Sequence, residues 1–111
     1  MATITYDDFL RVEIRVGKVV RVEDHLKARK PAYKVWVDFG ELGVKSSSAQ
    51  LTRRYTKEDL LGRQVVAVVN LEPKRVAGFV SEVLILGAVA SDEDVVLLRP
   101  DFEVAPGTRV L

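Results

Sequence analysis

The sequence predicts a single all-β domain, and three observations support this prediction. Apolar and polar residues alternate over several stretches of strand length, further stretches are almost continuously apolar, and only two short segments carry helix signals. The chain of 111 residues is 48% hydrophobic and 30% charged, which suits one ordinary globular core. No repeat, low-complexity tract or flexible linker divides it. We therefore expect one domain over residues 1–111.

The first predicted elements are a short helical turn and a long strand. Residues 7–10 suit the turn, and from Val12 to Val22 apolar side chains recur at alternate positions, which is typical of a half-buried strand. Lys18 breaks this alternation directly after Gly17, so we expect a bulge or a sharp bend at Gly17. A long strand that bends midway can take part in two sheets.

The middle of the chain predicts a hairpin and a short helix. Residues 32–39 alternate as a second strand, residues 41–43 make a tight turn, and residues 44–50 form a third strand. Thr56 is a good N-cap because acidic residues follow it, and Gly62 ends the short helix.

The second half of the chain carries three apolar strands. Residues 64–70 and 83–90 are almost continuously apolar, and residues 95–98 form a shorter run, so we expect these strands to lack a solvent-facing side. Residues 71–82 are rich in proline, glycine and basic residues, and they predict a long irregular loop of the kind that carries function.

The order of these elements narrows the fold class. Five main strands, a bent first strand and a short helix between the third and fourth strands are typical of the OB-fold, a five-stranded, partly open Greek-key barrel. We place the barrel core at residues 7–99. Residues 100–111 should form a short C-terminal extension.

The composition argues against enzyme chemistry. Without cysteine there is no thiolate zinc site and no cysteine nucleophile, and the single histidine excludes a histidine cluster. His25 has no assignable catalytic partner and is expected at the surface or at a cap, while residues 46–48 are serines expected to face solvent or bond the backbone. The acidic residues 92–94 are too few for a calcium loop. We predict a non-enzymatic protein that needs no cofactor and no metal.

Basic side chains gather in the first 90 residues. Residues 1–90 carry 15 basic and 11 acidic groups, whereas residues 91–111 carry 2 and 5, although the net charge is only +1. In an OB-fold the loops after the first and fourth strands flank a ligand groove over strands two and three. The basic and aromatic residues there are our candidate peptide- or RNA-binding residues: Arg29, Lys30, Lys34, Trp36, Arg53, Arg54, Lys74, Arg75 and Phe79.

Trp36 has two interpretations that the sequence leaves open. It shares a strand face with Lys34, which suits stacking on a base or packing against a peptide side chain. Burial of the indole in a subunit interface is equally compatible with the pattern.

Several motifs resemble a known family. Residues 15–19 (RVGKV), 37–40 (VDFG), 59–62 (DLLG) and 70–75 (NLEPKR) are similar to the tRNA-binding OB domain that occurs as a free dimer and appended to some aminoacyl-tRNA synthetases. Within that family, residues 27–34 (KARKPAYK), 47–51 (SSAQL) and 78–83 (GFVSEV) resemble the CsaA group of bacterial export-related chaperones.

The resemblance implies a homodimer that acts as a secretion-linked chaperone for unfolded preproteins or peptides. The alternative is a structure-specific tRNA-binding protein that uses the same basic loops. Residues 26–29 and 49–51 depart from the usual tRNA-binding pattern, and both segments lie beside the groove. Whether a secretion motor protein is a partner stays open.

Location, source and assembly follow from simpler observations. The first five residues lack the basic and apolar regions of a secretory signal, and no stretch is apolar enough to insert into a membrane, so we expect a cytoplasmic protein. The scarcity of Asn, Gln and Cys favours a heat-adapted source. The unbroken apolar strands and the segment 104–111 exceed what one small barrel can bury, which predicts a homodimer through the C-terminal strands.

Overall fold

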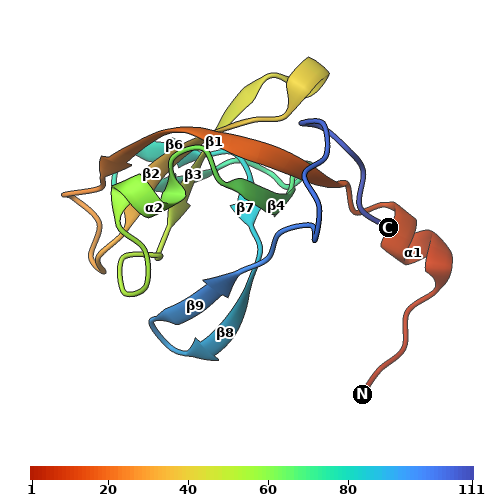
Figure 1. Cartoon of the computed structure of the whole chain (residues 1–111). Coiled ribbons are helices and arrows are strands. Elements are labelled where there is room, and N and C mark those ends of the chain that lie inside the picture. Colours follow the sequence, from red (N-terminus) through yellow and green to blue (C-terminus); the bar gives the residue numbers. More distant parts are fainter.

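The computed structural model describes residues 1–111 and confirms the all-β barrel. Along the chain its elements are α1 (Tyr6–Leu10), β1 (Ile14–Asp24), β2 (Tyr33–Asp38), the 3-10 helix η1 (Gly40–Leu42), β3 (Val44–Ala49), α2 (Lys57–Leu60), β4 (Gln64–Val68), β5 (Lys74–Val76), β6 (Phe79–Ser81), β7 (Leu84–Ile85), β8 (Gly87–Ser91) and β9 (Asp94–Leu97). Five strands form one curled antiparallel sheet in the order β3-β2-β1-β4-β7, and β5–β6 and β8–β9 form two separate hairpins (Figure 1).

β1 is the strand around which the sheet is built. Its second half pairs with β2, its first half pairs with β4, and Lys18 takes part in both ladders. The expected irregularity exists, but the register shifts between Val19 and Arg21 and not at Gly17. Gly17 has a different role, because a Cβ atom there would lie 2.4 Å from Cγ1 of Val37 and 2.7 Å from the ring of Phe39. The glycine therefore lets β1 pass close over the core.

A segment near the C-terminus completes the first half of β1. We call residues 104–110 the C-terminal strap. The Val16 amide donates to the Thr108 carbonyl at 2.8 Å, and the Val16 carbonyl accepts from the Gly107 amide at 2.7 Å. The side-chain amide of Gln64 donates to the Val104 carbonyl at 2.6 Å. The strap thus packs on its own barrel, at the edge of β1 that β2 leaves free.

The core lies inside the curled sheet. In β2 the side chains of Tyr33, Val35 and Val37 are buried, while Lys34 and Trp36 point to the other face, as their alternation predicts. α2 has Thr56 as its N-cap and buries Leu60 completely. The cluster of core residues is Val19, Tyr33, Val35, Val37, Phe39, Ala49, Leu51, Leu60, Val65, Ala67, Val83 and Leu97.

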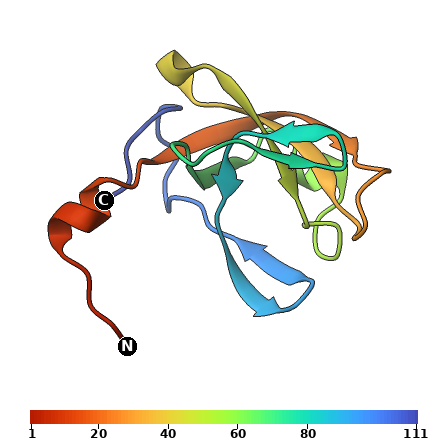
Figure 2. The same cartoon turned by 180° about the vertical axis from the view of Figure 1, so that it is seen from behind.

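The segment 71–82 is more regular than predicted. It contains the β5–β6 hairpin, which turns at Ala77 (φ 49°) and Gly78 (φ 84°). Two successive residues with positive φ make the type I′ turn that suits a two-residue hairpin loop. This hairpin, teal in Figure 2, lies beside β3.

The prediction of one continuous strand over residues 83–90 is wrong. β7 ends at Ile85, the Leu86 amide still bonds the Val66 carbonyl at 2.8 Å, and the chain then leaves the sheet to form the β8–β9 hairpin. This hairpin projects from the barrel (Figure 1). β4 lacks a solvent-facing side, as expected, because residues 65–68 are all buried. In β8 residues 88–90 are exposed, contrary to the prediction. No helix of the structure is long and apolar enough to cross a membrane.

Candidate binding groove

A groove follows the outer edge of β3. Three cavities of about 530, 340 and 130 Å³ adjoin one another, since the first two share Ser48 and Val76 and all three share Gln50. We call this surface the β3 groove. It is lined by Ala28, Arg29, Lys30, Pro31 and Ala32 before β2, by Ser48, Gln50, Thr52 and Arg53 at the end of β3, by Leu71, Glu72, Lys74, Val76, Ala77, Ser81, Glu82, Val83 and Leu84, and by Glu93.

The groove exists because β3 is an edge strand that is bonded to residues 80–83 only at Ser46 and Ser48. The Ser46 carbonyl accepts from the amides of Glu82 (2.8 Å) and Val83 (3.1 Å), and the Ser46 hydroxyl donates to the Val80 carbonyl at 2.8 Å. The Ser48 amide donates to Oγ of Ser81 at 2.9 Å. Beyond Ser48, the end of β3 and the β5–β6 hairpin separate and the groove opens between them.

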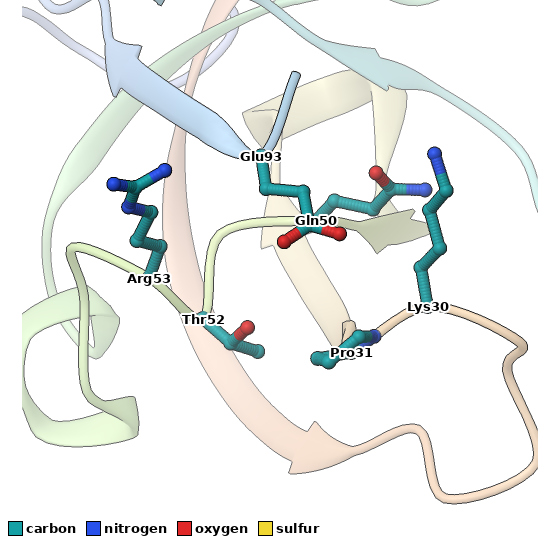
Figure 3. A pocket seen from close by; sticks show the side chains of 6 residues that line it. All are labelled: Lys30, Pro31, Gln50, Thr52, Arg53 and Glu93. Carbon is teal, nitrogen blue, oxygen red and sulfur yellow. The ribbon is translucent and has the colours of Figure 1, made fainter. Parts of the chain in front are cut away.

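One end of the β3 groove is strongly polar. Figure 3 shows Lys30 and Arg53 on opposite sides of the smallest cavity, with Glu93 reaching between them from the β8–β9 turn. Gln50 and Thr52 line the same space. This end can therefore accept both charged and neutral hydrogen-bonding groups.

An aromatic cluster lies on the other side of the β5–β6 turn. The ring of Phe79 meets the rings of Trp36 and His25 edge to face, each at a centroid distance of 5.6 Å. Nζ of Lys34 lies 5.3 Å from the Phe79 ring centre, and the guanidinium of Arg21 lies 4.6 Å from that of Trp36. Both aromatic side chains are half-buried, so cations already cover part of the surface that the sequence suggested for stacking.

His25 is buried and not at the surface, so the sequence-based expectation was wrong. Its side chain is 4% exposed, and Nδ1 lies 3.1 Å from Oγ of Ser48, while Nε2 has no hydrogen-bond partner. Ser46 and Ser47 are buried too, so they do not face solvent. The Ser46 hydroxyl bonds the backbone, which was the other expectation for these serines. Burial of His25 ties the end of β1 to β3 and β6.

The predicted basic residues do not form one surface. Four of them, Arg29, Lys30, Arg53 and Lys74, line the β3 groove, and Lys34 belongs to the aromatic cluster. Arg75 follows Lys74 in β5, so its side chain points to the opposite face. It is exposed and donates a hydrogen bond to the Gly78 carbonyl at 3.3 Å. Arg54 is held by Asp94. Their hydrogen bond raises the pKa of the Arg54 guanidinium and lowers the pKa of the Asp94 carboxyl.

A second ion pair engages the basic side chain at the start of α2. Nζ of Lys57 lies 3.0 Å from the Asp24 carboxylate, and this hydrogen bond raises the pKa of Lys57. Arg54 and Lys57 are thus paired within the chain, whereas no salt bridge occupies Arg29, Lys30, Arg53 or Lys74. All four cations of the groove are thus without an ion pair within the chain.

Two residues of this region were not among the candidate binding residues, although residues 49–51 were expected beside the groove. Gln50 lies at the junction of all three cavities, and its position two residues after Ser48 on one strand edge was the available signal. Arg21 lies over Trp36, which it opposes across the β1–β2 ladder. Only the register of the β1–β2 ladder, which is shifted by the bulge at Val20, could have revealed that Arg21 lies opposite Trp36.

Comparison with known proteins identifies the family. Residues 14–109 match the family described as "Putative tRNA binding domain". Among curated relatives, the methionine–tRNA ligase of Thermococcus onnurineus (strain NA1) is 44% identical over 107 residues, which is 96% of this chain. That match covers 14% of the ligase, so the chain spans about a seventh of the length of this curated relative.

Two solved structures match over almost the whole chain. The crystal structure of the chaperone CsaA from Bacillus anthracis str. Ames has a TM-score of 0.95 and 54% identity, covering 99% of this chain and 100% of that one. The CsaA chaperone protein from Picrophilus torridus has a TM-score of 0.91 and 45% identity, covering 98% and 100%. A MetRS related protein from Pyrococcus horikoshii follows with a TM-score of 0.88 and 30% identity over the full length of both chains. The chain therefore belongs to the tRNA-binding domain family, and within it to the CsaA group.

Proposed function

We propose that this protein is a chaperone of the CsaA type that binds unfolded preprotein segments in the β3 groove. It acts without catalysis, in the cytoplasm and as a homodimer. The similarity to chaperone CsaA structures along the whole chain supports this proposal. A link to secretion, through a motor protein or otherwise, rests on the resemblance alone.

The balanced charge of the groove is the observation that carries the proposal. Its four cations share the surface with three carboxylates and several apolar side chains; the carboxylates are Glu72, Glu82 and Glu93. These carboxylates would repel a polyanion, whereas a polypeptide of mixed composition can place opposite charges against both the cations and the carboxylates. Weak, sequence-tolerant capture of unfolded chain is the activity that such a lining favours.

Structure-specific tRNA binding is the second candidate. It is supported by the family match and by the similarity to a piece of methionine–tRNA ligases. In this function the exposed side chains of Arg29, Lys74 and Arg75 would contact phosphates. Trp36 and Phe79 would stack on bases, after Arg21 and Lys34 have moved from their faces.

A salt titration separates the two functions. We would measure binding of bulk tRNA and of a labelled unfolded preprotein at several salt concentrations. Phosphate binding weakens log-linearly with salt because counterions are released, whereas apolar capture changes little. We expect preprotein binding with a shallow slope.

The opposite result would favour the tRNA function. Micromolar tRNA binding with a steep slope, together with no preprotein binding, would contradict the chaperone proposal. In that case replacing both Lys74 and Arg75 with Ala should reduce the slope by about one to two units. Lys18→Ala, an exposed change on β1, is the control.

A further inference from the structure

The outer edge of β3 has free backbone groups where the groove opens. In a strand, the amide and carbonyl of one residue point to the same side, and alternate residues point alike. The Ser46 carbonyl and the Ser48 amide bond residues 81–83, so both residues face away from β2. The Ser48 carbonyl faces the same way and has no partner among the bonds outside the β2–β3 ladder.

Gln50 leaves still more unused bonding capacity. Its amide and carbonyl make no backbone hydrogen bond, and its side chain makes none either. A tight turn ends β3 here, because the Leu51 amide donates to the Ala49 carbonyl at 3.0 Å across Gln50. Exposed strand edges with unpaired amides and carbonyls are templates for another extended chain.

There is room for such a chain beside this edge. The cavities of about 530 and 340 Å³ meet at Ser48, Gln50 and Val76, one on the side of residues 28–32 and one on the side of Lys74. β6 contacts β3 without forming a ladder with it. The barrel seam is therefore bonded at Ser46 and Ser48 and open at Gln50.

We infer that the open seam binds one extended polypeptide segment by strand addition to β3. The Ser48 carbonyl accepts an amide of the bound segment, and the Gln50 amide donates to one of its carbonyls. Main-chain bonds of this kind are independent of sequence, and the apolar side chain of Val76 and the cations Lys30 and Lys74 select among side chains. This inference rests on the proposed function and specifies how its ligand is held.

A nucleic acid fits this edge less well than a peptide. A peptide backbone offers both an amide donor and a carbonyl acceptor with the spacing that the edge presents, whereas a phosphate offers acceptors alone. A phosphate placed at this edge would leave the Ser48 carbonyl unpaired, and the carboxylates of Glu72 and Glu82, which line the same cavity, would repel its charge. The edge chemistry therefore favours the polypeptide.

Replacing Gln50 with proline tests the backbone bond. Gln50→Pro removes the amide that would donate, and Gln50→Ala removes the side chain alone. Proline should be tolerated, because the Gln50 amide is unused, Ala49 is already extended and φ of Gln50 is not positive. With reduced and carboxymethylated α-lactalbumin as a permanently unfolded probe, we expect Gln50→Pro to bind about threefold to tenfold more weakly than Gln50→Ala.

Amide hydrogen exchange of the unmodified protein provides a second measurement. The Gln50 amide should exchange rapidly in the free protein and slow at least severalfold when the unfolded probe is bound. Equal binding by the two variants, with no protection of Gln50, would overturn strand addition while leaving the chaperone function standing. Failure of the unmodified protein to bind the probe would overturn both. Protection of Gln50 by bulk tRNA but not by the probe would assign the seam to RNA and also overturn the inference.

Discussion

At the scale of single residues, the barrel depends on the close approach of the β1 backbone to two core side chains at Gly17. Gly17 lies where β1 crosses the side chains of Val37 and Phe39, both of which are completely buried. Interiors packed to this density cannot absorb an added methyl group without displacing a neighbour. The absence of a side chain at this position is thus part of the core packing.

We predict that Gly17→Ala destabilises the protein. The new Cβ would lie 2.4 Å from Val37, which forces either that side chain or β1 to shift. Overpacking of this kind costs about 1–3 kcal/mol. Urea unfolding followed by circular dichroism measures the change, and Lys18→Ala, at an exposed neighbouring position, is the control, expected within about 0.5 kcal/mol. Equal stability of the two variants would show that the core has room at Gly17.

At the scale of elements, the sequence predicted those whose signals are local. The alternation in residues 32–39 fixed both faces of β2, and Thr56 followed three residues later by Asp59 is a capping box that begins α2. The sequence did not predict the β5–β6 hairpin, because its turn needs two residues in the left-handed conformation, which alanine, the residue at position 77, rarely adopts. An Asn at this position would have signalled the turn.

Non-local contacts explain the other differences. An almost continuous apolar run does not say where a chain leaves a sheet, so the break between β7 and β8 was hidden. The burial of His25 depends on Ser48 and Phe79, which come from other strands. The sequence predicted which loops carry the basic side chains of the candidate site. It did not predict which of these side chains form ion pairs, because the pairing of Arg54 with Asp94 depends on the placement of the β8–β9 hairpin.

The capping box of α2 should make stability depend on pH. The backbone amide of Thr56, and then its hydroxyl, lower the pKa of the Asp59 carboxyl. A carboxyl with a depressed folded-state pKa stabilises the protein above its unfolded pKa of about 4, and this contribution is lost as pH falls through the folded value. Asp59→Asn should therefore be less stable than the unmodified protein at neutral pH, and the gap should narrow below pH 4.

Thermal unfolding between pH 7 and pH 3 measures this gap. Asp92→Asn changes an exposed carboxyl that makes no hydrogen bond, and it is the matched control, expected to leave the pH dependence as it is. A gap that stays constant across the range would mean that the charge of Asp59 does not stabilise α2.

At the scale of the whole molecule, exposed apolar side chains follow β7, the β8–β9 hairpin and the residues after it, in addition to those near the N-terminus and in the loops. Leu84, Val89, Leu98 and Phe102 are exposed, Phe102 at 81% and Val89 at 71%. The expectation that β4 also needs a second subunit was wrong, since one chain buries residues 65–68 by itself. The surface that we propose for a partner is the region of β7, the β8–β9 hairpin and the residues that follow.

We predict a homodimer through this region. Light scattering during gel filtration at low micromolar concentration should give twice the chain mass of 12.4 kDa. Val89→Asp places a charge in the proposed interface and should shift the mass toward the monomer. Leu26→Asp is the control, because Leu26 is 89% exposed but lies in the loop between β1 and β2. A monomer mass whose melting temperature is unchanged on dilution would exclude the interface.

The C-terminal strap has a consequence for how the chain folds as it is synthesised. β1 is the first strand to be synthesised, yet the free edge of its first half is filled by residues 107–110, which follow all the other strands in the sequence. A nascent chain can pair β2 with β3 early, since they are neighbours in sequence, but the first half of β1 keeps one free edge until the strap is available. Until then Val16 keeps an unpaired amide, and the growing chain is itself an unfolded polypeptide with an open strand edge.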